Sequence, residues 1–218
     1  MRLIFLGSPG AGKGTLAAKA VAILKLPHIS TGAIFRAAIA AGNPLGLRVK
    51  VVIDEGQLVD DETTVALVRA RLAQPDAQKG YILDGFPRTI PQAEALEDFS
   101  AVDKVVNFDI PDSTVLERLS GRQICRKCGI NYHVIFNKPK KEGICDTCGG
   151  AIYIRNDDRE AAIIERLEVY REQTAPLIEF YRKKGLLVDV DAQPSVDEVV
   201  ENFKKAVGIC SGMIDRIK

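Results

Sequence analysis

The stretch GSPGAGKGT, from Gly7 to Thr15, decides how this chain is interpreted. It follows a short apolar run at residues 3–6 and opens an amphipathic segment that begins at Lys13. Glycines at these positions let backbone N–H groups converge on phosphate oxygens, and the start of the following helix adds partial positive charge. Because the spacing, the lysine and the strand–helix context occur together, the stretch predicts a loop that binds nucleotide phosphates.

The end of this phosphate loop departs from the commonest form of the motif. Position 14 is glycine, where a serine or threonine usually ligates Mg²⁺, and Thr15 comes one residue later. We therefore expect Mg²⁺ to be held mainly by substrate phosphates and water molecules.

Away from the loop, short apolar runs alternate with amphipathic segments along most of the chain. The runs are rich in Val, Ile and Leu, as expected of parallel strands that helices cover on both faces. We therefore expect an α/β fold in which a parallel sheet is flanked by helices. The expected strands cover residues 3–6, 81–83, 104–109 and 186–190, and the expected helices cover residues 13–24, 61–72, 113–119 and 159–183.

The segment from about residue 122 to 159 breaks this alternation. It is rich in Gly, Cys and Lys, and its β-prone runs at 132–136 and 151–154 predict a small β insertion. Two knuckles within it, Cys125-x₂-Cys128 and Cys145-x₂-Cys148, predict a structural metal site of four thiolates. Zinc is favoured, iron is an alternative, and disulfides are disfavoured in the cytosol. Cys210 stands apart and is expected to be a free thiol.

The composition narrows the class of protein. The chain of 218 residues carries 30 Lys and Arg against 29 Asp and Glu. Such a balanced chain has no overall field that holds a polyanion, so anion binding must depend on local clusters of cations. The sequence has no apolar run of ~18 residues and no signal-peptide core near its first residue. These features favour a cytoplasmic protein.

A second motif is the run YILDGFPR, a short strand that ends in Asp84 and continues into a turn. An acid at a strand end beside the phosphate loop is suited to orienting water molecules around Mg²⁺. Arg88, just beyond the strand, has the planar fork that binds a phosphate through parallel N–H groups.

These motifs together resemble the adenylate kinases in order and spacing. The resemblance runs from Met1 to about Gly208 and rests on the phosphate loop, Ser30-Thr31-Gly32 with Arg36, Gly56-Gln57-Leu58-Val59, the turn at 84–88 and Gln92. It implies the P-loop nucleoside monophosphate kinase fold, with a CORE of residues 1–29, 60–121 and 160–218. Residues 30–59 would form an AMP-binding flap, and residues 122–159 a zinc-binding lid. One departure is Ala33, where the family usually has Asp.

The resemblance also implies an activity and a set of site residues. The activity is reversible, Mg²⁺-dependent phosphoryl transfer, ATP + AMP = 2 ADP, which maintains the adenine nucleotide pool, with a lid that closes and excludes water. The implied catalytic residues are Lys13, Arg88, Arg122, Arg155 and Arg166. The implied ATP contacts are Gly10, Ala11, Gly12, Lys13, Gly14, Thr15, Arg118, Arg122, Asn131, Tyr132 and Pro194. The implied AMP contacts are Thr31, Arg36, Gln57, Leu58, Val59, Gly85, Phe86, Pro87, Arg88, Gln92, Arg155 and Arg166.

Other residues are expected to support these contacts. Asp84 would orient Mg²⁺-bound water, and Asp157 and Asp158 would orient the arginines. Tyr132 suits the core of the lid as well as it suits an ATP contact. Neither His28 nor His133 lies in the motifs, so we expect a packing role for His28 and a structural role in the lid for His133.

The chemistry does not require a general base. The second phosphate pKa is about 6, so the acceptor oxygen of AMP is already ionised near neutral pH. Positioning and charge stabilisation by Lys, Arg and Mg²⁺ then account for catalysis.

Two other functions fit part of the sequence. A UMP/CMP kinase would share the phosphate loop and the arginines, although Gln92 and the long four-cysteine lid favour AMP. A zinc-ribbon nucleic-acid-binding ATPase would explain the cysteines but would leave Arg36, Arg88 and Gln92 without a role. The expected partners are therefore ATP, AMP and ADP, with no nucleic acid and no membrane, and the enzyme is expected to be a monomer.

Overall fold

The structure of the protein is a computed structural model that describes residues 1–209, so Cys210 lies outside the described residues. In this part of the chain, a five-stranded parallel sheet has the order β2-β3-β1-β4-β8. Its strands are β1 (Arg2–Gly7), β2 (His28–Ser30), β3 (Tyr81–Asp84), β4 (Lys104–Asp109) and β8 (Leu187–Asp191). The predicted strands are confirmed. The prediction missed β2, because three residues are too few for a periodic signal.

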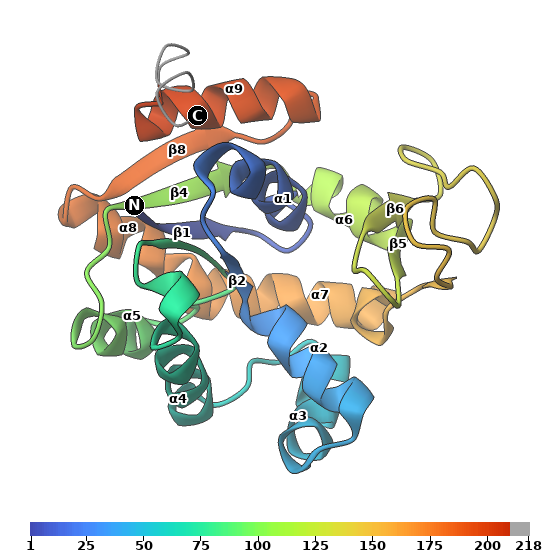
Figure 1. Cartoon of the computed structure of the whole chain (residues 1–218), viewed down its shortest axis with the longest axis horizontal. Helices are drawn as coiled ribbons and strands as arrows, with labels where there is room; N and C mark the ends of the chain where they lie inside the picture. The colour runs from blue at the N-terminus through green and yellow to red at the C-terminus, as the bar shows by residue number, and fades with distance from the viewer. Residues whose placement is uncertain (210–218) are drawn as a thin grey trace.

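Helices cover both faces of the sheet (Figure 1), which confirms the predicted fold class. One face carries α1 (Lys13–Leu24) and α9 (Val196–Val207). The opposite face carries α4 (Asp61–Leu72), α5 (Ile90–Glu97) and α8 (Pro176–Lys183), with a short 3₁₀ turn, η1 (Pro75–Ala77), leading into β3. No helix within residues 1–209 is both long and apolar enough to cross a membrane.

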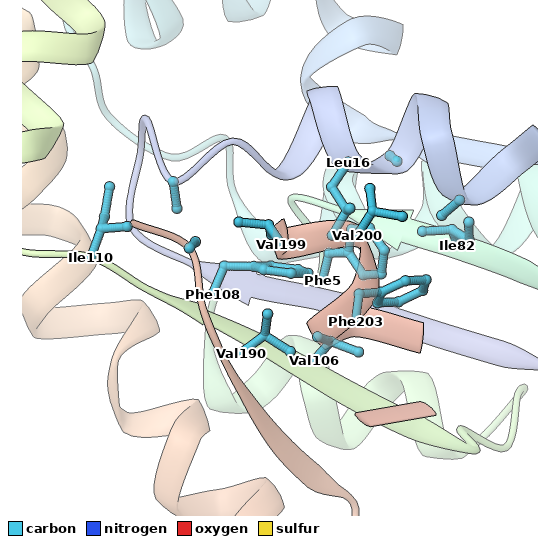
Figure 2. Packing of buried hydrophobic residues seen from close by; sticks show 14 of the residues in the cluster. Phe5, Leu16, Ile82, Val106, Phe108, Ile110, Val190, Val199, Val200 and Phe203 are labelled. Atoms are coloured by element: carbon cyan, nitrogen blue, oxygen red, sulfur yellow. The ribbon is translucent and has the colours of Figure 1, made fainter. Parts of the chain in front are cut away.

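The sheet is buried on both faces, which makes its strand ends rigid. Leu3 and Phe5 of β1 pack under α1 and α9, and the residues between and after them pack under α4, α5 and α8. Figure 2 shows the first of these clusters, in which Phe5 packs edge-to-face against Phe108 and Phe203, with centroid distances of 5.0 and 5.6 Å. The loop that follows β1 therefore starts from a fixed point.

A pair of helices, α2 (Thr31–Ala41) and α3 (Pro44–Asp54), extends from the end of β2. The side chain of Ser30 caps α2, and Asn43 Oδ1 caps α3 by accepting from Gly46 N at 2.8 Å. The helices cross closely, because a Cβ atom at Gly46 would lie 2.1 Å from the carbonyl oxygen of Ala38. These two helices form most of the segment that we call the flap (residues 30–59).

The helix predicted over residues 159–183 is confirmed in extent, but the prediction missed a π-helical turn within it. The segment consists of α7 (Glu160–Val169), a π-helical turn, η3 (Tyr170–Thr174), and α8. Pro176, the first residue of α8, has no N–H group to donate and its ring crowds the preceding turn. Ala175 N instead donates to the carbonyl of Tyr170 at 2.8 Å, five residues back.

The predicted β insertion is confirmed after α6 (Asp112–Ser120). In the described chain it forms a three-stranded antiparallel sheet of order β6-β5-β7, set apart from the central sheet (Figure 1). The strands are β5 (Arg122–Cys125), β6 (Asn131–His133) and β7 (Ile152–Tyr153). β6 ends earlier than predicted, because His133 Nδ1 accepts from the N–H groups of Ile135 and Phe136, at 3.1 and 3.3 Å, and closes a turn.

Candidate active site

The motifs of the sequence meet in one cleft of about 1680 Å³ at the carboxyl ends of β1, β2 and β3. Open parallel sheets bind ligands at this edge, where the loops after adjacent strands converge. The phosphate loop, the flap, the turn after β3, the lid (residues 122–159) and the loop after β8 all contribute to its lining.

The phosphate loop has the backbone that its glycines predict. Gly10 and Gly12 adopt left-handed conformations with φ of 80° and 85°. A Cβ atom at Gly10 would also lie 3.1 Å from Leu119, so both the backbone conformation and the limited space favour glycine at this position. No side chain caps the start of α1, which leaves the N–H groups of its first turn for an anion. Ala11, Gly14 and Thr15 line the cleft as well.

Lys13 is held over this loop by its own backbone. Nζ donates to the carbonyls of Gly7 at 2.7 Å and Ser8 at 2.8 Å. Burial lowers the pKa of Lys13 to about 8; Asp84 opposes this shift and Arg88 adds to it. The ammonium group is therefore charged at neutral pH and loses its charge in moderate alkali.

Asp84 ends β3, and its carboxylate faces the same cleft. Oδ2 lies 3.2 Å from Nε2 of His28 on the neighbouring strand. Burial acts to raise the pKa of Asp84, but His28 and Lys13 outweigh it and lower the pKa, so the carboxylate stays ionised. The predicted packing role for His28 was wrong, because its ring contacts this acid. The two residues are 56 positions apart, and the register of β2 against β3 brings them together.

The turn after β3 holds Arg88 through its own backbone. Arg88 Nε donates to the Gly85 carbonyl at 3.0 Å, and Thr31 Oγ1 donates to the same carbonyl at 2.8 Å. Gly85 has φ of 81°, and a Cβ atom there would lie 3.0 Å from both side chains. The arginine lines the cleft, as does Pro87. Burial lowers the pKa of Arg88.

Some of the residues implied for AMP do not line the cleft. Gln92 is 1% exposed; its Oε1 accepts from Arg88 N at 2.8 Å and its Nε2 donates to Asp61 at 2.7 Å. Phe86 is fully buried in the core cluster under α4, α5 and α8. The side-chain hydroxyl of Thr31 is used by the Gly85 carbonyl. These residues support the turn.

The flap contributes a cation and a short apolar edge. Arg36 on α2 and Leu58 beyond α3 line the cleft. Burial lowers the pKa of Arg36 to about 10, with a neighbouring arginine adding to the shift, so the group remains charged at neutral pH. Gln57 points away from the cleft, with Nε2 donating to Glu165 on α7, and Val59 is buried within the flap core.

Three arginines from the lid ends and α7 meet two aspartates on a short 3₁₀ turn, η2 (Asn156–Asp158). We call these five residues the arginine–aspartate cluster. Arg122 Nε donates to Asp158 at 2.7 Å, Arg155 Nε to Asp157 at 2.8 Å, and Arg166 Nη1 to Asp158 at 3.0 Å. Burial lowers the pKa of Arg166 to about 10 despite this pairing. The aspartates fix the guanidinium groups, which line the cleft.

Arg118 on α6 is anchored to the loop after β8. Its Nη2 donates to the carbonyl of Ala192 at 3.0 Å, and Pro194 of the same loop also lines the cleft. At this end of the cleft, the side chain of Arg118 is therefore held against the backbone of the loop after β8.

Asn131 and Tyr132 both line the cleft from β6, but the tyrosine is mainly part of the lid core. It is 5% exposed. Its Oη accepts a hydrogen bond from Asp146 N at 2.8 Å and donates its own proton to Cys145 Sγ at 3.4 Å. The hydroxyl group of Tyr132 thus serves the cysteine cluster.

The four lid cysteines are arranged as a metal site. Their sulfur atoms all lie within 4.8 Å of one another, and Cys125–Cys148 and Cys128–Cys145 are separated by 3.4 and 3.5 Å. A zinc ion with bonds of about 2.3 Å to four sulfurs needs sulfur–sulfur edges of about 3.8 Å, and the observed separations, from 3.4 Å to at most 4.8 Å, lie on both sides of this value. The cysteines are free, so the disulfide alternative does not apply.

A family model and the sequences of known proteins both match this chain, and they agree on one family. A family model described as Adenylate kinase matches residues 5–186. A protein of Treponema denticola called adenylate kinase is 58% identical over 204 residues, covering 94% of this chain and 98% of the relative. Proteins of the same name from Methanocella arvoryzae and Geobacillus sp. are each 49% identical, covering 95% of this chain and 98% and 99% of those relatives.

Proposed function

This chain belongs to the adenylate kinase family, and from that premise we propose that its cleft binds ATP at the phosphate loop and AMP between the flap and Arg88. The chain is a nucleoside monophosphate kinase, a phosphotransferase of the reaction ATP + AMP = 2 ADP, and its substrates are adenine nucleotides. The observation that carries the proposed arrangement is the convergence of Lys13, Arg88 and the arginine–aspartate cluster on one cleft.

The donor side is proposed to be the phosphate loop and the surfaces beside it. Lys13 exchanges the carbonyls of its own loop for the β- and γ-phosphates, while the N–H groups of 10–15 bind the remaining phosphate oxygens. Arg118 and Pro194 then lie along the adenosine, and Asn131 and Tyr132 approach from the lid. These assignments are supported by the shared lining of the cleft.

The acceptor side is proposed to be the flap and the turn after β3. Arg36 and Arg88 bind the phosphate of AMP, and Leu58 with the backbone of Gln57, Val59 and Gly85 encloses the nucleoside. Direct contact between Gln92 and adenine requires its amide to exchange Asp61 for the base, because both ends of that amide are bonded within the protein.

Transfer is proposed to proceed by positioning and charge stabilisation. The acceptor oxygen of AMP is ionised near neutral pH, so no side chain needs to remove a proton. Arg122, Arg155 and Arg166 stabilise the charge on the transferring phosphoryl group, with their orientation fixed by the aspartates of η2. Mg²⁺ bound with ATP would neutralise phosphate oxygens, and Asp84 would orient its water ligands. The lid excludes water as a competing acceptor.

The metal of the lid is proposed to be structural zinc. The four cysteines supply a full tetrahedral set and leave no position for a substrate. The metal therefore stabilises the lid without taking part in the reaction. We further propose that the enzyme acts as a cytoplasmic monomer without nucleic acid or membrane, in keeping with its balanced charge of 30 cationic and 29 anionic residues.

Replacement of Arg88 tests the proposed division of the cleft. Arg88→Ala removes the charge-assisted contacts to the AMP phosphate, so KM for AMP should rise more than tenfold, on the order of the 1.5–3 kcal/mol of such bonds. KM for ATP should stay within about twofold. Arg69→Ala is the control, because Arg69 is exposed on α4, where it lies over the ring of Phe99. Equal weakening of both nucleotides would place Arg88 on the wrong substrate.

A panel of acceptors tests the substrate class. The rate at which the nucleoside diphosphate forms is measured with ATP as the donor and AMP, CMP, UMP or GMP, in turn, as the acceptor. We expect the highest kcat/KM with AMP. Preference for CMP or UMP would favour the alternative nucleoside monophosphate kinase that shares these arginines.

A further inference from the structure

The helix that follows the lid changes its register at η3. Because Ala175 N bonds to Tyr170 O rather than to residue 171, this turn holds one residue more than an α-helical turn. One extra residue rotates the faces that follow by about 100°. Leu167 on α7 accordingly packs in the core cluster under α1 and α9, whereas Leu177 on α8 packs in the cluster on the opposite face of the sheet.

Thr174 is the last residue of this wide turn and is 8% exposed. A threonine within an α-helix usually returns its hydroxyl to a carbonyl three or four residues earlier. Here Oγ1 donates instead to the backbone carbonyl of Arg88, 2.9 Å away and 86 positions earlier in the chain. Both residues line the cleft. The π-helical turn therefore presents a hydroxyl group to the turn after β3.

This contact completes the restraint of Arg88. Its N–H donates to Gln92 at 2.8 Å, its Nε donates to Gly85 at 3.0 Å, and its carbonyl accepts from Thr174 at 2.9 Å. The backbone N–H and carbonyl groups are thus both fixed by side chains, one from α5 and one from η3. An arginine whose backbone is fixed in this way loses little freedom when it binds a phosphate.

We propose that Thr174 is a positioning residue for phosphoryl transfer, which acts by holding the backbone of Arg88 so that the guanidinium group meets the phosphate of AMP. This inference rests on the proposed role of Arg88. Without the hydroxyl, the Arg88 carbonyl loses its partner on η3 and the turn gains freedom. The phosphate loop follows β1, and Thr174 makes its hydrogen bond to the turn after β3, so ATP binding should be unaffected.

Two variants of Thr174 test this proposal. Thr174→Val removes the hydroxyl and keeps the branched shape, and Thr174→Ser keeps the hydroxyl. In Thr174→Val, kcat/KM for AMP should fall about five- to tenfold, as expected for one buried hydrogen bond, with KM for ATP within about twofold. Thr174→Ser should restore most of the loss. Should Thr174→Val fail to fold, Thr174→Ala takes its place with the same expected results.

A double-mutant cycle with Arg88→Ala separates positioning from a general loss of structure. If Thr174 acts through Arg88, adding Thr174→Val to Arg88→Ala should lower kcat/KM for AMP by less than about twofold. A full additional loss in that background, an equal loss for ATP, or unchanged kinetics in Thr174→Val would overturn the positioning role. If Arg88→Ala itself does not weaken AMP selectively, the proposed role of Arg88 fails first, and the proposal for Thr174 fails with it.

Discussion

At the scale of single residues, Lys13 combines a fixed position with a charge that titrates. Its ammonium group donates to two carbonyls of the loop, and burial lowers its pKa to about 8. The positive charge is complete below that pH and is lost above it. Phosphates bound beside the ammonium group raise the pKa again, because a nearby negative charge favours the charged form. Free enzyme and nucleotide-bound enzyme therefore titrate differently.

This difference predicts the pH dependence of the reaction. For the free enzyme, kcat/KM for ATP should be level up to about pH 8 and then fall, approaching tenfold for each further pH unit. The kcat at saturating ATP and AMP should stay level to a higher pH, since the bound phosphates hold the proton on Lys13. Both profiles are measured by a coupled assay whose enzymes are in excess at every pH. A level kcat/KM up to about pH 9.5 would contradict the burial of this charge.

Residues such as Lys13 and Arg88 were predictable because each lies in a compact motif whose spacing has a physical reason. His28 and Thr174 were not predictable in the same way. Each acts on a residue far along the chain, 56 positions away for His28 and 86 for Thr174. Such contacts depend on which distant segments pack together, through strand register for His28 and through the packing of η3 on the turn after β3 for Thr174, and a local sequence pattern does not report this. The burial of Gln92, whose amide bonds to Asp61 within the protein, also depends on tertiary structure.

At the scale of elements, the two aspartates that pair with the arginines of the cleft both lie on one short turn, η2. Asp158 has a side chain that is fully buried, and it accepts from both Arg122 and Arg166. A buried carboxylate that joins two arginines to one turn makes the orientation of both depend on it. The flap meets the same turn, where Asn156 Nδ2 donates to Asp54 at 3.2 Å.

Asp158→Asn should therefore weaken both the fold and the reaction. Removing one partner of a buried ionic network typically destabilises a protein by about 3–5 kcal/mol, because the remaining charges stay buried and unpaired. Urea unfolding should show a lower midpoint with an unchanged slope, and kcat should fall with it in samples that are still folded. Glu201→Gln is the control, since Glu201 forms an exposed pair with Lys204 on α9. An unchanged midpoint would show that the arginines are held by other contacts.

Strand β6 links the cleft to the metal site through neighbouring residues. Asn131 lines the cleft, and the hydroxyl group of Tyr132 donates to Cys145. Tyr132→Phe should weaken zinc retention by about tenfold or more, because hydrogen bonds to metal ligands strengthen metal binding. Competition with a chromophoric chelator measures this, and Tyr153→Phe on β7 of the same sheet serves as the control. Equal zinc affinity in the two variants would show that the Tyr132 hydroxyl does not support the site.

Long periodic elements were the easiest to predict. α4 was predicted with its observed bounds, Asp61–Leu72, and its first turn is capped by Asp60. The π-helical turn between α7 and α8 was missed, although Pro176 gave a signal for it. The helices of the flap were not predicted at all: α2 starts directly after a three-residue strand, and the capping residues Ser30 and Asn43 were not recognised as helix starts.

At the scale of the whole molecule, the lid is an insertion whose two ends carry Arg122 and Arg155 into the cleft. The cysteines of its metal site hold the segment between these ends together. Cys145→Ser combined with Cys148→Ser should lower the melting temperature, because metal binding to the folded lid contributes folding free energy. Well below that temperature, ADP formation should stay near the wild-type rate. A variant that keeps its circular dichroism spectrum yet transfers no phosphoryl group would show that the metal is more than structural.

The crowded charge of the cleft also bears on how this sequence is maintained through evolution. Burial lowers the pKa of Lys13 to about 8 and of Arg36 to about 10, which means that the native state disfavours charges that substrates require. Mutations that neutralise such groups tend to make a protein more robust while ending its turnover. Selection for growth must therefore keep a buried charge such as that of Lys13 even where a neutral side chain would make the folded protein sturdier.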